Sequence, residues 1–344
     1  KAGALNDALA ASREPLVAVL DVDHEPDPDF LVATLPHLAP GVAYAQAVVE
    51  WRNDDGLLRR LAATLQRQFY HGVQTDKGSR ERAVFAGSAA VFRREALDAV
   101  GGFPEETLVE DFDLTLRLAC AGWKGRLAPA VGARGLLPWT AGDLARQLWR
   151  WSSGTTAVVR RRLVPTLRAR GAPLAPRLEL LADGCAYLAG GLLVAAAILL
   201  VAAGLADVPV ARPLGGWSVL LAPGAVAVAH MASGWQALAR SGRRGRRLLP
   251  LYHVVSLAFT PILFLSSLAA LAPGRGRVEG RVAKARSSPR GSTVALALAA
   301  LLGLAALGAA AFTDLSAAAT GWVALMGLSF TATLAAARAP EKQA

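Results

Sequence analysis

Two acidic side chains separated by one residue, Asp21 and Asp23, follow a short apolar run. Carboxylates at this spacing suit a hard divalent cation that keeps some of its waters and shares its remaining positions with phosphate oxygens. A turn explains the pair alone equally well, because residues 24–29 are rich in Asp and Pro. In that case the acids of this segment are solvated or cap a helix that begins near Phe30.

A second acidic pair, Glu110 and Asp111, opens a segment with helical character. Unpaired N–H groups and the helix dipole favour an ionised carboxylate at such a position, so Asp111 could accept a proton from an alcohol. Ordinary helix-start chemistry is the alternative, and Asp113 is assigned to it.

Gln147, Arg150 and Trp151 are spaced i, i+3 and i+4, so an amide, a guanidinium and an indole share one helix face. The guanidinium matches a diphosphate, and the flat indole can stack on a sugar ring. Anchoring at a membrane interface is the alternative, and Trp149 with the basic run 160–162 is assigned to it.

The segment Phe85–Ser88 precedes an expected strand and the basic pair Arg93 and Arg94. Gly87 would allow the backbone to approach a ligand closely, although a glycine before a strand is more often a simple turn.

The elements that must position these residues are those of an α/β domain. The apolar run 16–20 predicts a parallel strand buried on both faces, with the first acidic pair at its carboxyl end, where open α/β sheets bind ligands. A helix is expected over 110–121, ended by Gly122, and another is N-capped by Asp143 and runs through Trp151. An α/β nucleotide-binding domain normally begins with further βα units, so a missing N-terminal segment is expected.

Composition points to a membrane in the second half of the chain. Of 344 residues, 53% are hydrophobic and 18% are charged, which excludes disorder. Two cysteines, expected to be reduced, exclude a disulfide scaffold. Most of the net charge of +11 lies after residue 183, in short runs between uncharged stretches, and the nearly neutral first half argues against nucleic acid binding.

Five stretches without acidic or basic residues each exceed the roughly 20 residues that a membrane-spanning helix needs. They are 184–206, 213–239, 248–274, 291–313 and 315–337. The third contains Pro250 and Pro261 and separates two basic loops that should both stay cytoplasmic. One interpretation is a hairpin that re-enters the membrane or lies at its interface. The other is a membrane-spanning helix, in which case one of the two basic loops departs from the positive-inside rule.

Taken in this order, the motifs resemble those of the membrane-embedded family 2 glycosyltransferases, the group that holds cellulose, chitin, hyaluronan and poly-N-acetylglucosamine synthases. The resemblance covers residues 1 to about 160. Lys1–Asn6 is similar to the family's K-A-G-x-x-N, Asp21–His24 to D-x-D-H, Phe85–Ser88 with Arg93 and Arg94 to its acceptor-side loop, Glu110–Asp111 to T-E-D, and Gln147–Trp151 to Q-x-x-R-W.

The resemblance implies a GT-A type, Rossmann-like α/β domain over 1–160 on the cytoplasmic side of the cell membrane, incomplete at its N-terminus. An interfacial linker over 161–183 and a multi-pass α-helical region over 184–338 would follow.

It also implies inverting sugar transfer from a nucleotide-sugar, a UDP-sugar rather than a GDP-sugar. Asp111 would be the catalytic base, and Asp23 with Asp21 would hold Mg²⁺ or Mn²⁺. Lys1, Asp21, Gln147 and Arg150 would bind the donor nucleotide and diphosphate; Trp151, Gly87, Ser88 and Glu110 would bind the acceptor. The sequence departs from the family pattern at two positions. Val109 stands in place of Thr, and Leu148 stands in place of a basic or Gln residue; the second change puts binding of the donor diphosphate in question.

Three functions follow as hypotheses. The first is a processive polysaccharide synthase that exports its product through the membrane helices, with an accessory export or regulatory subunit. The second is single glycosylation of a lipid acceptor. The third is a truncated, non-catalytic membrane protein, for which the Asp111→Asn change would leave sugar turnover unaltered.

Overall fold

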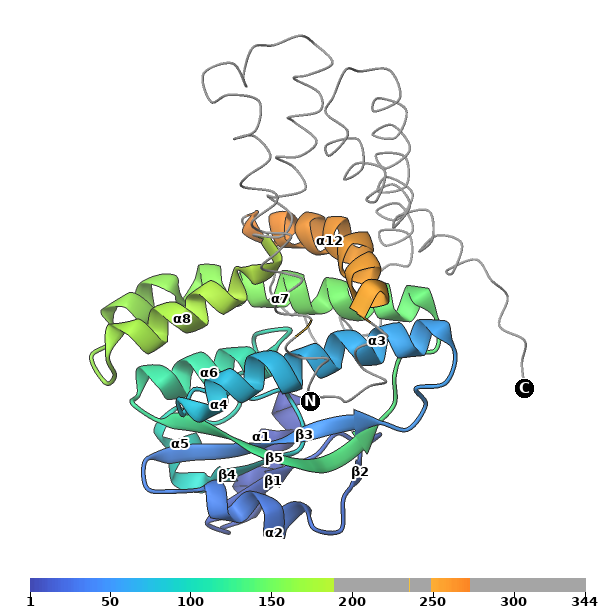
Figure 1. Ribbon diagram of the computed structural model, residues 1–344. Coiled ribbons are helices and arrows are strands. Elements are labelled where there is room, and N and C mark those ends of the chain that lie inside the picture. The colour runs from blue at the N-terminus through green and yellow to red at the C-terminus, as the bar shows by residue number, and fades with distance from the viewer. Residues whose placement is uncertain (189–234, 236–248, 273–344) are drawn as a thin grey trace, which may run out of the picture.

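The computed structural model describes residues 1–188, 235 and 249–272. Its centre is a five-stranded mixed sheet in the order β1-β4-β3-β5-β2 (Figure 1). The strands are β1 (Leu16–Val19), β2 (Glu25–Pro26), β3 (Val42–Trp51), β4 (Ala90–Arg93) and β5 (Lys124–Gly135). The expected α/β class is confirmed.

The sheet is built around β3, in which Val42 to Val49 are all buried between the two covering layers. Its pairing with β5 is parallel, and the other three pairings are antiparallel. The parallel strand predicted over 16–20 is therefore wrong in direction and burial. As β1 it pairs antiparallel with β4 at the edge of the described sheet, and only Val19 is buried.

Helices cover the sheet in successive layers (Figure 1). One layer holds α3, α4 and α6, a second holds α7 and α8, and α12 lies across α7. The helices are α1 (Ala2–Ala11), α2 (Phe30–Thr34), α3 (Leu57–Gln68), α4 (Thr75–Ser79), α5 (Arg94–Ala99), α6 (Glu110–Cys120), α7 (Ala141–Arg168), α8 (Leu174–Gly184) and α12 (Leu249–Leu271), with a 3₁₀ turn at Leu35–His37 and a π-helical turn at Phe69–Gln74.

The two helices expected to carry chemistry form where the sequence predicts them. Helix α6 ends as expected, because Gly122 adopts φ +90° and the N–H of Trp123 bonds the carbonyl of Leu118 at 3.0 Å. The start of α7 corrects the prediction that Asp143 is its N-cap. The N-cap is Thr140, whose hydroxyl accepts the N–H of Asp143 at 3.1 Å and donates to its carboxylate at 2.8 Å.

Helix α12 corresponds to the predicted apolar stretch 248–274. Phe259 and Ile262 pack in one cluster with Ala62 of α3 and Leu148 of α7. Its C-terminal end receives hydrogen bonds from Arg160, at 3.3 Å to the Leu271 carbonyl and 2.7 Å to the Ala272 carbonyl.

Among the described residues, no helix combines the length and the apolarity needed to cross a membrane. The predicted stretches 291–313 and 315–337 lie outside the described residues, as does nearly all of 184–206 and of 213–239.

Candidate active site

The turn after β1 brings together Asp21, Asp23 and His24, whose ligand atoms all lie within 4.8 Å of one another. The N–H of His24 bonds the carbonyl of Asp21 at 3.0 Å, which closes the turn. Two carboxylates and one imidazole fit a divalent cation of the Mg²⁺ or Mn²⁺ type, with the nitrogen donor better tolerated by Mn²⁺. Burial lowers the pKa of His24 in spite of the two acids beside it, so the imidazole is neutral at pH 7. His24 was recognised from the sequence as part of the motif but was not expected to be a ligand.

The side chain of Ser88 bonds to this turn and is not exposed to solvent. Its hydroxyl accepts the N–H of Asp21 at 2.8 Å and lies 2.8 Å from Nδ1 of His24. The side chain is buried, with 1% of its surface exposed. Ser88 was expected to bind an acceptor, but its contacts serve the Asp21–His24 turn.

Lys1 connects the acidic turn to the other motifs. Its Nζ lies 2.5 Å from Oδ1 of Asp21 and 4.0 Å from Oε1 of Glu110, and it donates to the carbonyl of Gly87. Three segments that are far apart in the sequence thus meet at one ammonium group. Arg52 adds a contact that the sequence did not reveal, from its Nη2 to the carbonyl of Asp23 at 3.1 Å.

Asp111 lies partly buried in the first turn of α6, and its Oδ1 accepts the N–H of Phe112 at 2.8 Å. Burial, reinforced by the charge of Glu110, raises the pKa of Asp111 to about 6, against the opposing effect of that hydrogen bond, Lys1 and Arg150. The position at the start of α6, taken alone, would favour a low pKa for Asp111. A carboxylate with this pKa is largely ionised at neutral pH and is a stronger base than an ordinary aspartate.

Gly87 is required beside Asp111 for two reasons. Its φ is +86°, a conformation that favours glycine. A Cβ at this position would lie 3.0 Å from Oδ2 of Asp111. The close backbone approach predicted for Gly87 is therefore to a carboxylate of the same chain.

Two residues outside the sequence motifs bond to the segment Phe85–Ser88 and fix its position. Gln46 is fully buried in β3; its Nε2 donates to the carbonyl of Ser88 at 2.8 Å and its Oε1 accepts the N–H of Ala86 at 2.9 Å. Thr115 of α6 accepts the N–H of Phe85 at 3.1 Å and donates to the carbonyl of Asp111 at 2.9 Å. A glutamine within an otherwise apolar strand was the available signal for Gln46.

Gln147, Arg150 and Trp151 lie partly buried on α7, which packs against α6. The charge of Arg150 is near enough to lower the pKa of Asp111. Trp151 packs against the cluster that includes Val109 and Phe112. Leu148 is buried between α3, α7 and α12, so its side chain points into the interhelical core.

Helix α7 approaches the start of α6 very closely at Gly154. A Cβ on Gly154 would lie 2.8 Å from Cγ1 of Val109, the residue that precedes the acidic pair. Val109 is buried, with 4% of its surface exposed, and fills the space between the two helices.

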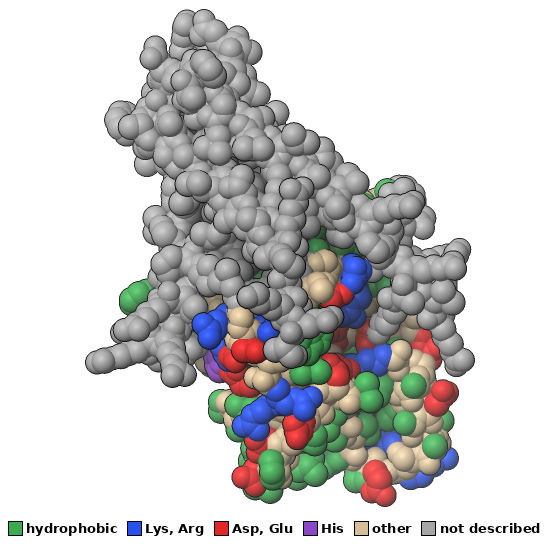
Figure 2. All heavy atoms as spheres, turned by 90° about the vertical axis from the view of Figure 1, so that its right-hand side faces the viewer, with side chains coloured by type: hydrophobic (Ala, Val, Ile, Leu, Met, Phe, Trp, Pro, Cys, Tyr) green, Lys and Arg blue, Asp and Glu red, His purple; other side chains and the backbone are tan. Residues whose placement is uncertain are grey.

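The remaining charged residues of the motifs lie elsewhere. Arg93 donates to the carbonyl of Leu38, and Arg94 bonds Oγ of Ser12 at 2.6 Å, so this pair fastens the far end of β4. Asp113 is fully buried and pairs with Arg162, where a helix-start charge and an interfacial arginine were expected. Figure 2 shows acidic and basic side chains spread over the visible face of the described part of the protein, with histidine at one edge.

Comparison with known proteins identifies the family of this chain. Residues 16–272 match the family model described as glycosyl transferase family group 2. "Probable glucomannan 4-beta-mannosyltransferase 7" from Oryza sativa subsp. japonica is 31% identical over 188 residues, 53% of this chain and 32% of the relative. "Glucomannan 4-beta-mannosyltransferase 9" from Arabidopsis thaliana is 33% identical over 168 residues, 47% of this chain and 32% of the relative.

The chain spans about a third of the length of these relatives. A solved structure, "Mannosyltransferase PcManGT from Pyrobaculum calidifontis in complex with GDP-Man and Mn2+", aligns at 18% identity and a TM-score of 0.38, covering 98% of this chain and 66% of that one. The relatives are named for mannosyl transfer, which gives no support to the expected preference for a UDP-sugar. The family match covers well over half of the chain, and the chain belongs to glycosyl transferase family group 2.

Proposed function

We propose that the protein transfers a sugar, with inversion, from a nucleotide-sugar to a growing polysaccharide. The observation that carries the proposal is the position and pKa of Asp111. The pKa of this carboxylate is raised to about 6, the carboxylate lies against Gly87, and it is close enough to Lys1 and Arg150 for their charges to act on its pKa. It is thus a base beside two groups suited to bind a diphosphate.

The donor diphosphate would lie between the Asp21–His24 turn and α7. Asp21, Asp23 and His24 would hold Mg²⁺ or Mn²⁺, which offsets negative charge on the leaving diphosphate. Lys1 and Arg150 would contribute positive charge to the same group, from the start of α1 and from α7. The ion pair between Lys1 and Asp21, 2.5 Å long, loosens as phosphate oxygens enter.

Asp111 would take the proton of the acceptor hydroxyl. The hydroxyl oxygen bonds to the anomeric carbon as the bond from that carbon to the diphosphate oxygen breaks, and the nucleoside diphosphate leaves with the bonding electrons. Attack from the face opposite the leaving group gives inversion. Trp151 would stack on the acceptor sugar, while Gly87 and Glu110 shape the wall next to Asp111.

Mannose is the sugar that we propose, because the similar curated proteins are named as mannosyltransferases. They are 31–34% identical to this chain over about half of its length. A glucomannan-like polysaccharide is the corresponding product. Location at the cell membrane and export through it remain part of the proposal, supported by the five uncharged stretches after residue 183.

The test is the release of nucleoside diphosphate by the full-length protein with a panel of GDP- and UDP-sugars, including GDP-mannose, with Mg²⁺, with Mn²⁺ and with chelator. We expect release from a mannose donor that needs the metal and falls to background in the Asp23→Ala variant. Release from no donor in the presence of an oligosaccharide acceptor would contradict the proposal. Long products would support a polysaccharide synthase, whereas a single sugar on lipid would contradict it.

A further inference from the structure

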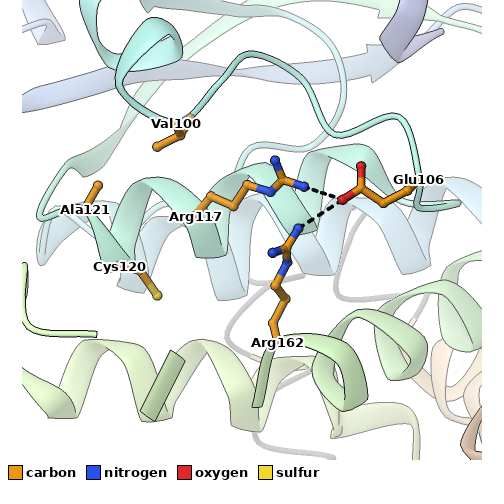
Figure 3. A pocket seen from close by; sticks show the side chains of 6 residues that line it. All are labelled: Val100, Glu106, Arg117, Cys120, Ala121 and Arg162. Carbon is orange, nitrogen blue, oxygen red and sulfur yellow. Dashed lines mark hydrogen bonds and ion pairs between the residues drawn. The ribbon is translucent and has the colours of Figure 1, made fainter. Parts of the chain in front are cut away.

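A cluster of charged side chains lies on the side of α6 that faces away from the candidate active site. Glu106, Arg117 and Arg162 line an open cavity of about 600 Å³ between the loop that precedes α6, α6 itself and α7 (Figure 3). The cluster joins three segments, and none of its side chains is among the residues to which the proposed reaction assigns a part.

Its centre is the pair formed by Asp113 of α6 and Arg162 of α7. Nε of Arg162 lies 2.7 Å from Oδ1 of Asp113, and Nη2 lies 3.2 Å from Oδ2. Two parallel bonds between a guanidinium and a carboxylate fix orientation as well as distance. Asp113 has no exposed surface, so water does not compete for these bonds.

Glu106 extends the pairing to the loop that leads into α6. Its Oε1 receives Nη2 of Arg117 at 2.7 Å, of Arg161 at 3.2 Å and of Arg162 at 3.3 Å. Figure 3 shows Arg117 and Arg162 reaching Glu106 from the two helices. The loop, the first turns of α6 and the second half of α7 are thereby tied together.

The Asp113–Arg162 pair lies away from the candidate active site. Asp111 and Asp113 are two residues apart, so they project from α6 at roughly 200° to each other. Asp111 faces Gly87, while Asp113 faces Arg162. On α7, Arg162 lies roughly 18 Å along the helix from Arg150. On its other flank, α6 is tied to the Phe85–Ser88 segment through Thr115.

We propose that Asp113 and Arg162 are positioning residues that set the placement of Asp111 against Arg150. The inference rests on the proposed function, in which these two groups act on the acceptor hydroxyl and the donor diphosphate. A misplacement of about 1 Å between catalytic groups can lower a rate by about a hundredfold, so the pair should matter for kcat more than for donor binding.

Two single variants and one matched control test this directly. Asp113→Asn removes a negative charge and Arg162→Gln removes a positive one, so direct electrostatic effects on Asp111 have opposite signs. We expect both variants to lower kcat by about 10- to 100-fold with donor KM within about threefold of the unaltered value. Because both variants break the Asp113–Arg162 pair, the loss of kcat in the double variant should be clearly smaller than the product of the two single losses.

Arg161→Gln is the control, because Arg161 is adjacent to Arg162 and contacts the same Glu106 at 3.2 Å, whereas the ion pairs that the structure describes for Asp113 are with Arg117 and Arg162. Its kcat should stay within about twofold of the unaltered protein. Arg162→Lys keeps the charge without the two-bonded geometry and should give an intermediate kcat, which also covers the case in which Arg162→Gln fails to fold.

Equal kcat for the Arg162→Gln and Arg161→Gln proteins, both folded, would overturn the inference, as would a rise in donor KM with kcat unchanged. A decrease of kcat in one single variant and an increase in the other would show a charge effect and would also overturn it. If the unaltered protein transfers no sugar, the proposed function fails first. Turnover by the unaltered protein with no difference among the variants defeats only the positioning role.

Discussion

At the scale of single residues, the proposed sugar transfer depends on Asp111 and its neighbours. The sequence identified the acid and its place at a helix start, and it predicted an ionised carboxylate for that reason. It could not show the burial that raises the pKa, because burial comes from Gly87 and from α7, which are distant in the chain. The same limit hid Gln46, whose partners lie about forty residues further on.

The raised pKa predicts how the rate depends on pH. Asp111 must be ionised to accept a proton, and its pKa is raised to about 6, so kcat should rise as pH passes through about 6 and level off near pH 7. An ordinary aspartate would place the midpoint near pH 4. The measurement is kcat at saturating donor between pH 4.5 and 8; a flat profile over this range would contradict the role of Asp111 as base.

Gly87 gives a second prediction at this scale. Gly87→Ala should lower kcat by about 10- to 100-fold, because the added Cβ would lie 3.0 Å from Oδ2 of Asp111 and displace it. Gly101→Ala is a matched control: its φ of +78° imposes a similar backbone cost, yet nothing lies within 4 Å of the added Cβ. The comparison uses kcat together with the melting temperature of each variant. Equal kcat losses in both variants would point to backbone strain alone.

At the scale of elements, local signals succeeded where the cause was local. The start of α6, its end at Gly122 and the strand after Ser88 were predicted from neighbouring residues. The direction of β1 was not, because an apolar run such as 16–20 is compatible with either direction of pairing. The N-cap of α7 was placed at Asp143 since Asp is a good cap, but Thr140 forms a reciprocal pair with that same residue.

The contact of α7 with the start of α6 predicts a rescue experiment. Gly154→Ala should lower kcat and the melting temperature, because its Cβ would lie 2.8 Å from Cγ1 of Val109 and force the helices apart at a cost of about 1–3 kcal/mol. Alanine favours a helix over glycine, so the loss would not come from helix propensity.

The double variant Val109→Ala/Gly154→Ala restores the space and should recover most of the kcat that Gly154→Ala loses. Val109→Ala alone serves as the control for the lost apolar contact. Failure of the double variant to recover activity would mean that the approach of α7 to α6 does not control the position of Asp111.

At the scale of the whole molecule, the five motifs converge because the mixed sheet and the α6 and α7 layers bring separate segments of the chain together. Residues from 1 to 151 meet around Asp111, and order along the chain does not show this. The family was predictable from short motifs and their order along the chain. Four of the five motifs lie at the start or end of an element, at the start of α1, after β1, before β4 and at the start of α6, where local sequence is informative. The expected preference for a UDP-sugar rested on the resemblance alone, and the relatives, which are named as mannosyltransferases, give it no support.

The central claim is that Asp111 is the base in sugar transfer to a polysaccharide. The most direct test measures incorporation of labelled mannose from GDP-mannose into polymer by the full-length protein and by its Asp111→Asn variant, with donor binding measured in parallel. We expect the Asp111→Asn variant to incorporate about 10²- to 10⁴-fold less mannose than the unaltered protein, with unchanged donor affinity. Incorporation by the variant within about tenfold of the unaltered protein would contradict it.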